Sequence, residues 1–226
     1  MSVETQAFLL LGWGILVGLD LVSVPQVMIA RPLVAGTVAG AMLGDIGTGL
    51  RLGVVFELLQ HDILPMGAVR YPEYGPATVA GVTAAHLAGG PLGLGLGAVV
   101  GLLTGLLGGA SIHWMRRLNS SAVRRSSERL EAGDVSALVR VHVMSILRDA
   151  ARAGLVTAVG LVLAAGVGQY LVGTMAVRGA TIVAVVAIGA AIAAGTAGTL
   201  RLVGRGPDLR WFAVGLLGGA AGAWLR

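Results

Sequence analysis

The sequence contains no cysteine and no lysine, and few of its residues are aromatic or charged. The absence of cysteine excludes disulfide frameworks and thiolate metal sites. Charged residues make up 12% of the chain, about half of the ~25% that is typical of soluble domains. Hydrophobic residues make up 56% of it, so water cannot be the main solvent of the folded surface. We therefore predict an all-α fold, a polytopic bundle of membrane helices.

Glycine is abundant where aromatic residues are scarce, with 37 glycines against 4% aromatic residues. Its spacing is regular: a glycine recurs at every fourth residue from Gly93 to Gly109 and again from Gly36 to Gly44. On a helix such glycines form a smooth stripe on which another backbone can pack closely. The spacing predicts tight helix packing. It leaves open whether the stripes serve self-assembly, contact with a partner subunit or the sliding of one bundle against another.

The distribution of arginine divides the chain into three regions. Residues 1–112 form a membrane region interrupted by ionisable residues, 113–152 are polar and basic, and 153–226 contain cleaner apolar runs. Basic loops of membrane proteins lie on the cytoplasmic side, so we predict that 113–152 is a cytoplasmic loop. The net charge of +5 then reflects membrane topology, and no nucleic-acid partner is expected. Within this loop the apolar spacing over 136–150 predicts an amphipathic helix, either interfacial or solvated.

Apolar runs predict a first membrane span near the start of the chain and three further spans in 153–226, the latter near the ~20 residues that such a helix needs, and they leave the exact number of spans open. The first, residues 7–19, is preceded by Glu4 and by no cation. A cleavable signal peptide begins with a positive region, so we expect this run to be retained as a span. The others are 153–171, 181–200 and the shorter 211–224.

Ionisable residues are concentrated between Asp20 and Glu73, inside the first apolar region. An ion at the centre of a bilayer costs roughly 2.5–3.5 kcal/mol on insertion scales. These residues must therefore be paired, lie at an interface or line a polar cavity. They are Asp20, Arg31, Asp45, Arg51, Glu57, His61, Asp62, Arg70 and Glu73.

The apolar pieces in this region are too short to cross a membrane as single helices. Residues 44–49 interrupt one stretch with three glycines, and residues 64–76 contain three prolines, which a regular helix does not tolerate. Short, interrupted pieces are typical of discontinuous helices or re-entrant hairpins, whose ends bind polar substrates near the midplane. We predict two such pieces, over 31–49 and over 51–76.

Glu57 is the residue in this region that we single out. On a helix, Gly53 lies one turn before it and leaves space beside the carboxylate, which suits hydrogen bonding to sugar hydroxyls or proton coupling. An ion pair with Arg51 or Arg70 that only fixes the fold is an equal alternative. A single histidine, His61, is too little for a metal site, and the sequence has no nucleophile or nucleotide-binding motif.

The order of the polar and glycine residues resembles a known family. The matching residues are Arg31-Pro32-Leu33-Val34, Leu43-Gly44-Asp45, Thr48-Gly49, Gly53, Glu57-Leu58, Gly67-Ala68 and Pro72 with an acid, Glu73; Val141-His142-Val143 and Arg152 follow later. This set is similar to the IIC membrane subunit of the mannose/fructose/sorbose family of bacterial phosphotransferase-system sugar transporters. The clearest part of the match covers about residues 25 to 80.

The resemblance implies a sugar permease of the bacterial inner membrane that forms oligomers and pairs with a second membrane subunit, IID. A separate IIB phospho-carrier protein would phosphorylate the sugar, so no catalytic or phosphorylated residue and no cofactor is expected on this chain. The resemblance further implies an elevator movement of re-entrant hairpins against a scaffold. The implied substrate-binding residues are Glu57, Asp45, Gln26, Gly67 and Glu73. Residues for ion pairs or proton coupling are Arg51, His61, Asp62 and Arg70.

Some residues depart from the family pattern and leave two other functions open. Pro65 replaces a polar amide, and Glu73 stands where the family usually has aspartate. Charge is added near the site by His61, Asp62 and Arg70. These changes motivate a transporter of the same fold that works without phosphorylation, coupled to protons. A non-transporting membrane scaffold that uses its glycine stripes for assembly is the third hypothesis.

Overall fold

The computed structural model describes residues 2–61, 63, 71–172, 174, 176–203, 210, 211, 213–215, 217 and 218. Over these residues the ordered elements are helices, as the composition predicts. The helices with defined bounds are α1 (Val3–Val22), α2 (Pro32–Leu43), α3 (Ile46–Gln60), α4 (Tyr74–Ala88), α5 (Gly90–Arg125), α6 (Ser127–Glu131), α7 (Val135–Tyr170) and α8 (Val177–Val203).

Among the described helices, α1, α5, α7 and α8 are long and apolar enough to cross a membrane. The 20 residues of α1 extend about 30 Å, the thickness of the hydrocarbon core. α2, α3 and α4 have 12, 15 and 15 residues and reach only about 18 to 22 Å. The prediction of a polytopic helical membrane protein is confirmed, while most of the predicted span 211–224 lies outside the described residues.

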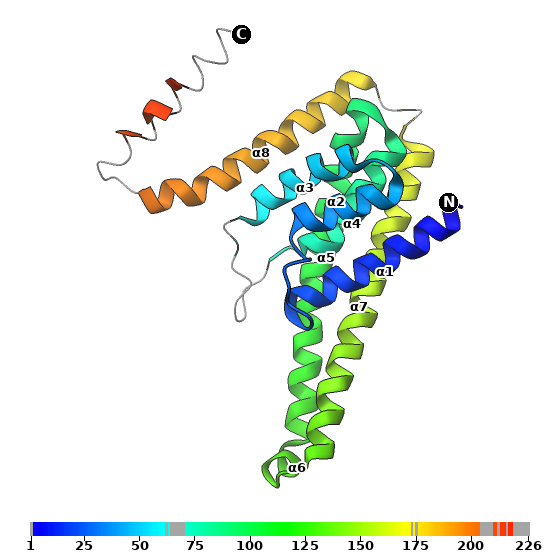
Figure 1. The fold of residues 1–226 in the computed structure, drawn as a ribbon, viewed down its shortest axis with the longest axis vertical. Coiled ribbons are helices and arrows are strands. Elements are labelled where there is room, and N and C mark those ends of the chain that lie inside the picture. The colour runs from blue at the N-terminus through cyan, green and yellow to red at the C-terminus, as the bar shows by residue number, and fades with distance from the viewer. Residues whose placement is uncertain are drawn as a thin grey trace.

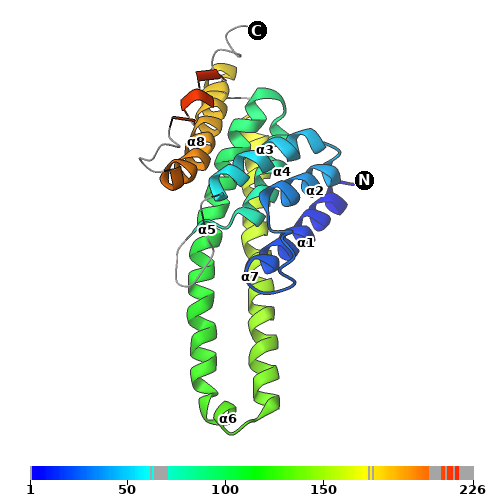
Figure 2. The ribbon, with the colours of Figure 1, turned by 60° about the vertical axis from the view of Figure 1, so that its left-hand side comes forward.

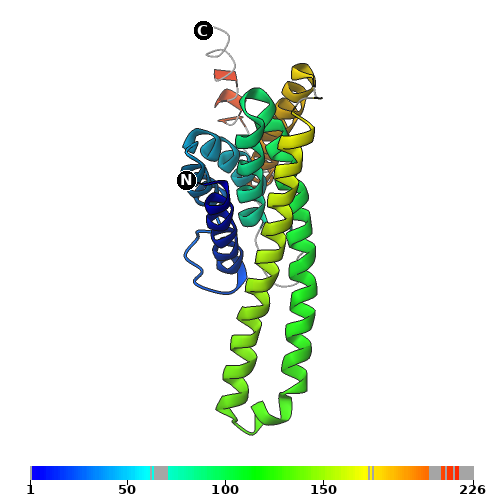
Figure 3. The same cartoon turned by 90° about the vertical axis from the view of Figure 1, so that its right-hand side faces the viewer.

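Two antiparallel helices, α5 and α7, run through the length of the molecule (Figure 1). Each has 36 residues and is therefore about 54 Å long. Helices α1 to α4 gather around one half of this pair, and α6 closes its far end (Figures 2 and 3). α8 packs against α5 and α3.

The far half of the α5–α7 pair is formed by residues 113–152, which we call the hairpin extension. We expected a loop here with a helix over 136–150. In the structure the extension is helical almost throughout, because α5 continues to Arg125 and α7 begins at Val135. The helix expected over 136–150 is part of α7. The basic region is thus a projecting helical hairpin rather than a loop.

The glycine stripe of α5 is the surface on which α4 packs. A Cβ atom at Gly97 would lie 2.6 Å from the Gly81 carbonyl oxygen, and Cβ atoms at Gly93 and Gly109 would overlap the backbone of Ala85 and Tyr71. Twelve of the 15 residues of α4 are buried, so α4 is the central helix. Along this stripe, close packing therefore occurs within the chain.

A second glycine contact joins α2 and α3 into a tight hairpin, the α2–α3 hairpin. A Cβ atom at Gly36 would lie 2.6 Å from the carbonyl oxygen of Gly49. Pro32 begins α2, where a missing N–H is tolerated, and Gly44 ends it in the left-handed conformation at φ 75°. Asp45 then caps α3. The break predicted over 44–49 is thus a two-residue turn.

The start of α4 corrects one expectation about the proline-rich segment. We expected irregular backbone through Pro76, but α4 begins at Tyr74 and contains Gly75 and Pro76 in its first turn. The first N–H groups of a helix have no acceptor within the helix, so a proline there removes no hydrogen bond. Only residues 71–73 of this part are irregular among those that the structure describes.

Candidate functional site

Glu57 lies one turn before the end of α3 and faces the beginning of α2. Its Oε2 accepts a hydrogen bond from the Leu33 backbone N–H at 3.2 Å, and its Oε1 forms an ion pair with the Arg31 guanidinium. Leu33 is the second residue of α2, so its N–H has no acceptor within that helix and lies at the positive end of the helix dipole. The Glu57 carboxylate therefore stabilises the start of α2 and joins the two arms of the α2–α3 hairpin.

The surroundings of Glu57 differ from those that the spacing indicates. A Cβ atom at Gly53 would lie 2.9 Å from the Pro32 carbonyl oxygen, so α2 occupies the space that Gly53 leaves. The ion-pair partner of Glu57 is Arg31; Arg51 is exposed elsewhere on α3. The pair remains accessible, because the Arg31 and Glu57 side chains are 45% and 13% exposed. A polar solute that displaces Arg31 would meet a carboxylate that the hairpin already holds in place.

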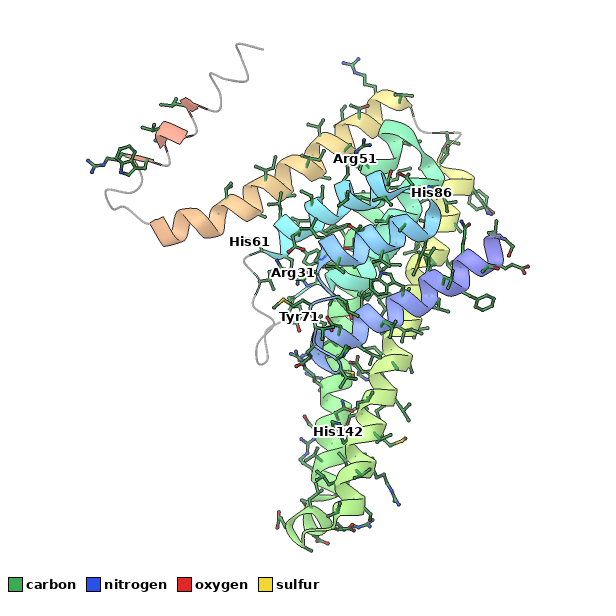
Figure 4. The ribbon with its side chains drawn as sticks, in the orientation of Figure 1. Arg31, Arg51, His61, Tyr71, His86 and His142 are labelled. Atoms are coloured by element: carbon green, nitrogen blue, oxygen red, sulfur yellow. The ribbon has the colours of Figure 1, made fainter. Side chains whose placement is uncertain are left out.

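His61 follows Glu57 by one turn and ends α3 as its C-cap. Its side chain is exposed. Figure 4 shows His61 and Arg31 at one end of the α2–α3 hairpin and Arg51 toward the other. Arg51 and His61 are the two residues of the set predicted for ion pairing that the structure describes, and His61 is the nearer of them to the Arg31–Glu57 pair.

Asp45 lies in the turn at the opposite end of the α2–α3 hairpin. Its Oδ1 accepts a hydrogen bond from the Thr48 N–H at 3.1 Å as the N-cap of α3. Its Oδ2 is 3.5 Å from Nδ1 of His86. The 12 residues of α2 separate Asp45 from the Arg31–Glu57 pair by about 18 Å. Asp45 and Glu57 therefore do not form one compact site.

The segment between α1 and α2 is held by Asp20, which is 4% exposed. Its two carboxylate oxygens accept hydrogen bonds from the backbone N–H groups of Val27 and Ala30, at 2.6 and 2.9 Å. Gln26 and Met28 in this segment have positive φ angles of 58° and 68°, which are uncommon for residues other than glycine. Such strained backbone persists only where its surroundings hold it, and it is concentrated at functional sites.

Gln26 borders a cavity of about 690 Å³ between this segment and the hairpin extension. Neither Arg31 nor Glu57 lines it. Gln26 and Glu57 are therefore separate features of the bundle. The polar side chains around the cavity are Ser23, Gln26, Arg116, Asn119, Ser120, His142 and Ser145.

Glu73 belongs to a buried ion cluster that joins α1, α4, α5 and α7. Arg152 donates to both carboxylate oxygens of Glu73, at 2.6 and 2.9 Å, and from its Nε to Asp149 at 2.8 Å. Nη1 of Arg152 also donates to the Ser111 hydroxyl at 3.1 Å, and the Ser23 hydroxyl donates to Asp149. Glu73 and Asp149 are 0% exposed and Arg152 is 7% exposed.

This cluster has a structural consequence and an electrostatic one. Removing one partner from a buried ion pair typically costs about 3–5 kcal/mol, because an uncompensated charge remains, so the cluster strongly couples the helices that it joins. Two carboxylates share one guanidinium, so the cluster carries a net negative charge unless one carboxylate binds a proton. In this structure the Glu73 oxygens are engaged with Arg152 and closed to a solute.

Three of the predicted residues, Gly67, Asp62 and Arg70, lie outside the described residues. Their roles in substrate binding or ion pairing stay predictions. Over the part of the chain that the structure describes, histidine, aspartate and glutamate nowhere gather in a group of three or more that could hold a metal ion.

Two residues of the buried cluster were missed at the level of sequence. The sequence places Arg152 in the basic region and among the residues that carry the family resemblance, and neither pattern indicates a buried pair with Asp149. An aspartate and an arginine three residues apart lie on one helix face, and here they directly precede the apolar run 153–171. That position at the edge of a span was the available signal for a buried pair.

Comparisons with known proteins place this architecture in a family. A family model described as the PTS system sorbose-specific IIC component matches residues 4–221. The fructose permease IIC component of Bacillus subtilis (strain 168) is 25% identical over 145 residues, which cover 64% of this chain and 53% of that protein. The mannose-specific EIIC component of the PTS system of Escherichia coli (strain K12) is 24% identical over 122 residues, which cover 54% of this chain and 45% of that protein.

Solved structures show the same fold. One, described as the structure of a membrane protein, superposes with a TM-score of 0.78 at 19% identity and covers 97% of this chain and 88% of that one. A chain from the cryo-EM structure of the mannose transporter ManYZ in complex with microcin E492 gives a TM-score of 0.50 at 18% identity, with the same coverage.

The chain belongs to the sorbose-specific IIC family of the phosphotransferase system, because the family model matches nearly its whole length. The resemblance drawn from the polar and glycine residues is thereby confirmed. The chain spans about half the length of the curated relatives that it matches.

Proposed function

We propose that this chain is the sugar-translocating IIC subunit of a phosphotransferase-system permease, which moves a sugar inward for phosphorylation by a separate IIB protein. The observation that carries the proposal is the family match over residues 4–221. The names of the relatives, a fructose permease component and a mannose-specific component, indicate the substrate class. A monosaccharide is the substrate that we propose.

Glu57 is the residue that we propose for sugar recognition. Its carboxylate is fixed by the Leu33 N–H and pairs with a half-exposed Arg31. A carboxylate accepts hydrogen bonds from sugar hydroxyls, and Arg31 would be released or would donate to the sugar when it binds. His61 lies one turn further along α3. The site is incomplete over the described residues, and we propose that Gly67 in the segment after α3 completes it.

The other predicted substrate residues take different parts in this proposal. Asp45 fixes the turn of the α2–α3 hairpin, and Gln26 borders the cavity beside the hairpin extension. Glu73 is closed by Arg152, so we propose that it positions the helices. The shortness of α2 and α3 supports a re-entrant hairpin that moves against the α5–α7 pair in an elevator movement.

The assembly that we propose follows from the family and from the surface. A IID-like membrane subunit and a IIB protein are the partners, and the bacterial inner membrane is the location. The hairpin extension would lie in the cytoplasm, since its arginines come after the apolar part of α5 and before the apolar part of α7. α8 presents apolar side chains outward, among them Ile182, Val185 and Val186, each more than half exposed. Lipid or a partner subunit would cover such a surface.

A second candidate function is transport of the same kind without phosphorylation, coupled to protons. The buried cluster favours it, because two carboxylates share the charge of Arg152 and one of them can take up a proton. In that case Glu73 would carry the coupling proton.

Uptake of labelled sugar into proteoliposomes separates the two candidates. The complex would be reconstituted with its partner membrane subunit and tested with fructose, mannose and sorbose. We expect uptake that requires IIB and a phosphoryl donor and yields sugar phosphate inside. Uptake that continues without IIB and collapses with a protonophore would instead establish the second candidate, and no uptake of any sugar under either condition would contradict both.

A further inference from the structure

The hairpin extension carries an arginine-lined hollow that the sugar site does not use. The hollow has a volume of about 400 Å³. It lies on one face of α5, because each lining residue is three or four positions from another one, the spacing that brings side chains together on a helix. They are His113, Arg116, Arg117, Ser120 and Arg124.

This hollow adjoins the cavity of about 690 Å³ beside Gln26, and the two share Arg116 and Ser120. That cavity is also lined by hydrogen-bonding groups from two other elements, Ser23 at the end of α1 and His142 on α7. Figure 4 shows His142 on the hairpin extension, below the end of the bundle where Tyr71 lies. Each volume lies in the range of about 300–1,000 Å³ that is usual for small-molecule sites.

We call the hollow and the adjoining cavity together the combined hollow, and its charged lining residues are arginines. No aspartate or glutamate is among the described residues that line either part. Two acids of the hairpin extension are engaged with other arginines: Asp134 pairs with Arg129, and Asp149 with Arg152. Arg117 and Arg124 are exposed at the rim, and Arg116 is anchored by a hydrogen bond of 3.2 Å to the Tyr71 hydroxyl.

The side chains of the combined hollow can bind both a phosphate group and hydroxyl groups. Guanidinium groups bind phosphate through pairs of charged hydrogen bonds, while hydroxyl, amide and imidazole groups bind the hydroxyls of a polyol. We propose that the hollow is a binding site for a phosphate group carried on a polyol. Arg117 and Arg124 hold the phosphate, and the cavity beside Gln26 holds the hydroxyls.

Two sources could supply such a ligand. One is a sugar phosphate, which would be formed on this face of the membrane; this source rests on the proposed function. The other is the headgroup of an anionic phospholipid, since basic groups next to the cytoplasmic end of a span attract such lipids. The proposed phosphate site depends on neither source, because the same arginines line the hollow in both cases.

The test uses the purified full chain with its partner membrane subunit in nanodiscs of phosphatidylcholine. Binding of mannose 6-phosphate, of inorganic phosphate and of unphosphorylated mannose would be measured by calorimetry. A parallel arm would use native mass spectrometry to count phosphatidylglycerol and phosphatidylcholine molecules retained by the protein. The double variant Arg117→Gln/Arg124→Gln is compared with Arg140→Gln/Arg178→Gln, which removes the same charge from exposed positions outside the hollow.

We expect Arg117→Gln/Arg124→Gln to weaken phosphate binding about tenfold or more, the loss that one charged hydrogen bond typically causes. The control variant should bind as the unmodified protein does. Binding of mannose 6-phosphate identifies the sugar phosphate as the ligand, and selective retention of phosphatidylglycerol identifies the lipid; either supports the phosphate site. Equal binding by both double variants would overturn it. So would the absence of both preferences, for the sugar phosphate over the free sugar and for phosphatidylglycerol over phosphatidylcholine.

The experiment distinguishes failure of the phosphate site from failure of the proposed transport function. Phosphate binding in nanodiscs requires no IIB protein, no phosphoryl donor and no movement of sugar. A protein that binds phosphate yet transports nothing would refute the proposed function alone. An unmodified protein that transports sugar yet shows no selective binding of a sugar phosphate or of phosphatidylglycerol would refute the site alone.

Discussion

Removing Arg152 should destabilise the bundle more than removing any exposed arginine. Arg152 makes three charged hydrogen bonds, two to Glu73 and one to Asp149, at 2.6, 2.9 and 2.8 Å. Both carboxylates are 0% exposed, so Arg152→Met would leave two buried charges without compensation. Breaking a buried ion pair costs about 3–5 kcal/mol. At about 2–4 °C for each kcal/mol in a chain of this length, the expected loss in Tm is roughly 6–20 °C.

The matched control is Arg148→Met, one turn away on the same helix. Arg148 makes a single hydrogen bond of 3.2 Å to Asn119 at a partly exposed position, and such interactions contribute less than about 1 kcal/mol. Thermal unfolding of both variants in the same detergent, followed by circular dichroism, gives the comparison. Combining Arg152→Met with Glu73→Leu should recover part of the loss, since one unpaired charge is then removed. Equal melting temperatures for Arg152→Met and Arg148→Met would refute the assignment of the cluster as a major source of stability.

Three further predictions follow from the packing and the caps. Gly93→Ala should cost about 1–3 kcal/mol, because its Cβ would overlap the Ala85 backbone; Gly12→Ala, with nothing within 4 Å, is the control in the same thermal assay, and equal losses would contradict the packing. Asp20→Asn should speed amide exchange at Val27 and Ala30, whose N–H groups bond to the two carboxylate oxygens, and unchanged exchange there would count against this role. Hydrogen bonds from Ser136 and from the Ala137 N–H, together with Arg129, hold the pKa of Asp134 below its ordinary value. The stabilising effect of Asp134 is therefore present above the unfolded aspartate pKa of about 3.9 and disappears only as the pH falls below it. Asp134→Ala should accelerate amide exchange at Ala137 at pH 7. In the unmodified protein, a protection factor at Ala137 that already falls between pH 7 and about pH 4 would contradict this role of Asp134.

The features that could be predicted from the sequence are those that depend on local periodicity and composition. Apolar length predicted α1, α7 and α8 as spans, and the four-residue spacing of glycine predicted that a backbone would pack along Gly93 to Gly109. The break at Gly44 and Asp45 arises because the glycine adopts the left-handed conformation and the aspartate caps the next helix. Both effects depend only on residues that are adjacent in the sequence.

The features that could not be predicted are the long-range pairs. Arg152 and Glu73 are 79 positions apart, and the Glu57 carboxylate meets the Leu33 N–H across 24. The partner of an ion depends on how helices are arranged in space, and Arg51 and Arg31 were equally available to Glu57 by sign of charge. The spacing showed that Gly53 leaves room beside Glu57, but not that α2 would fill it. Periodicity likewise could not show that the basic region continues the two long helices.

A measurement of sugar binding tests most directly whether Glu57 is the carboxylate that recognises the sugar. The purified complex with its partner membrane subunit would be titrated with labelled fructose, mannose and sorbose in a scintillation proximity assay, comparing the unmodified protein with Glu57→Gln and with the exposed control Glu131→Gln. We predict saturable binding of at least one sugar, a loss of about tenfold or more for Glu57→Gln, and no change for Glu131→Gln. Saturable binding that Glu57→Gln leaves unchanged would contradict the assignment of Glu57 as the sugar-binding carboxylate.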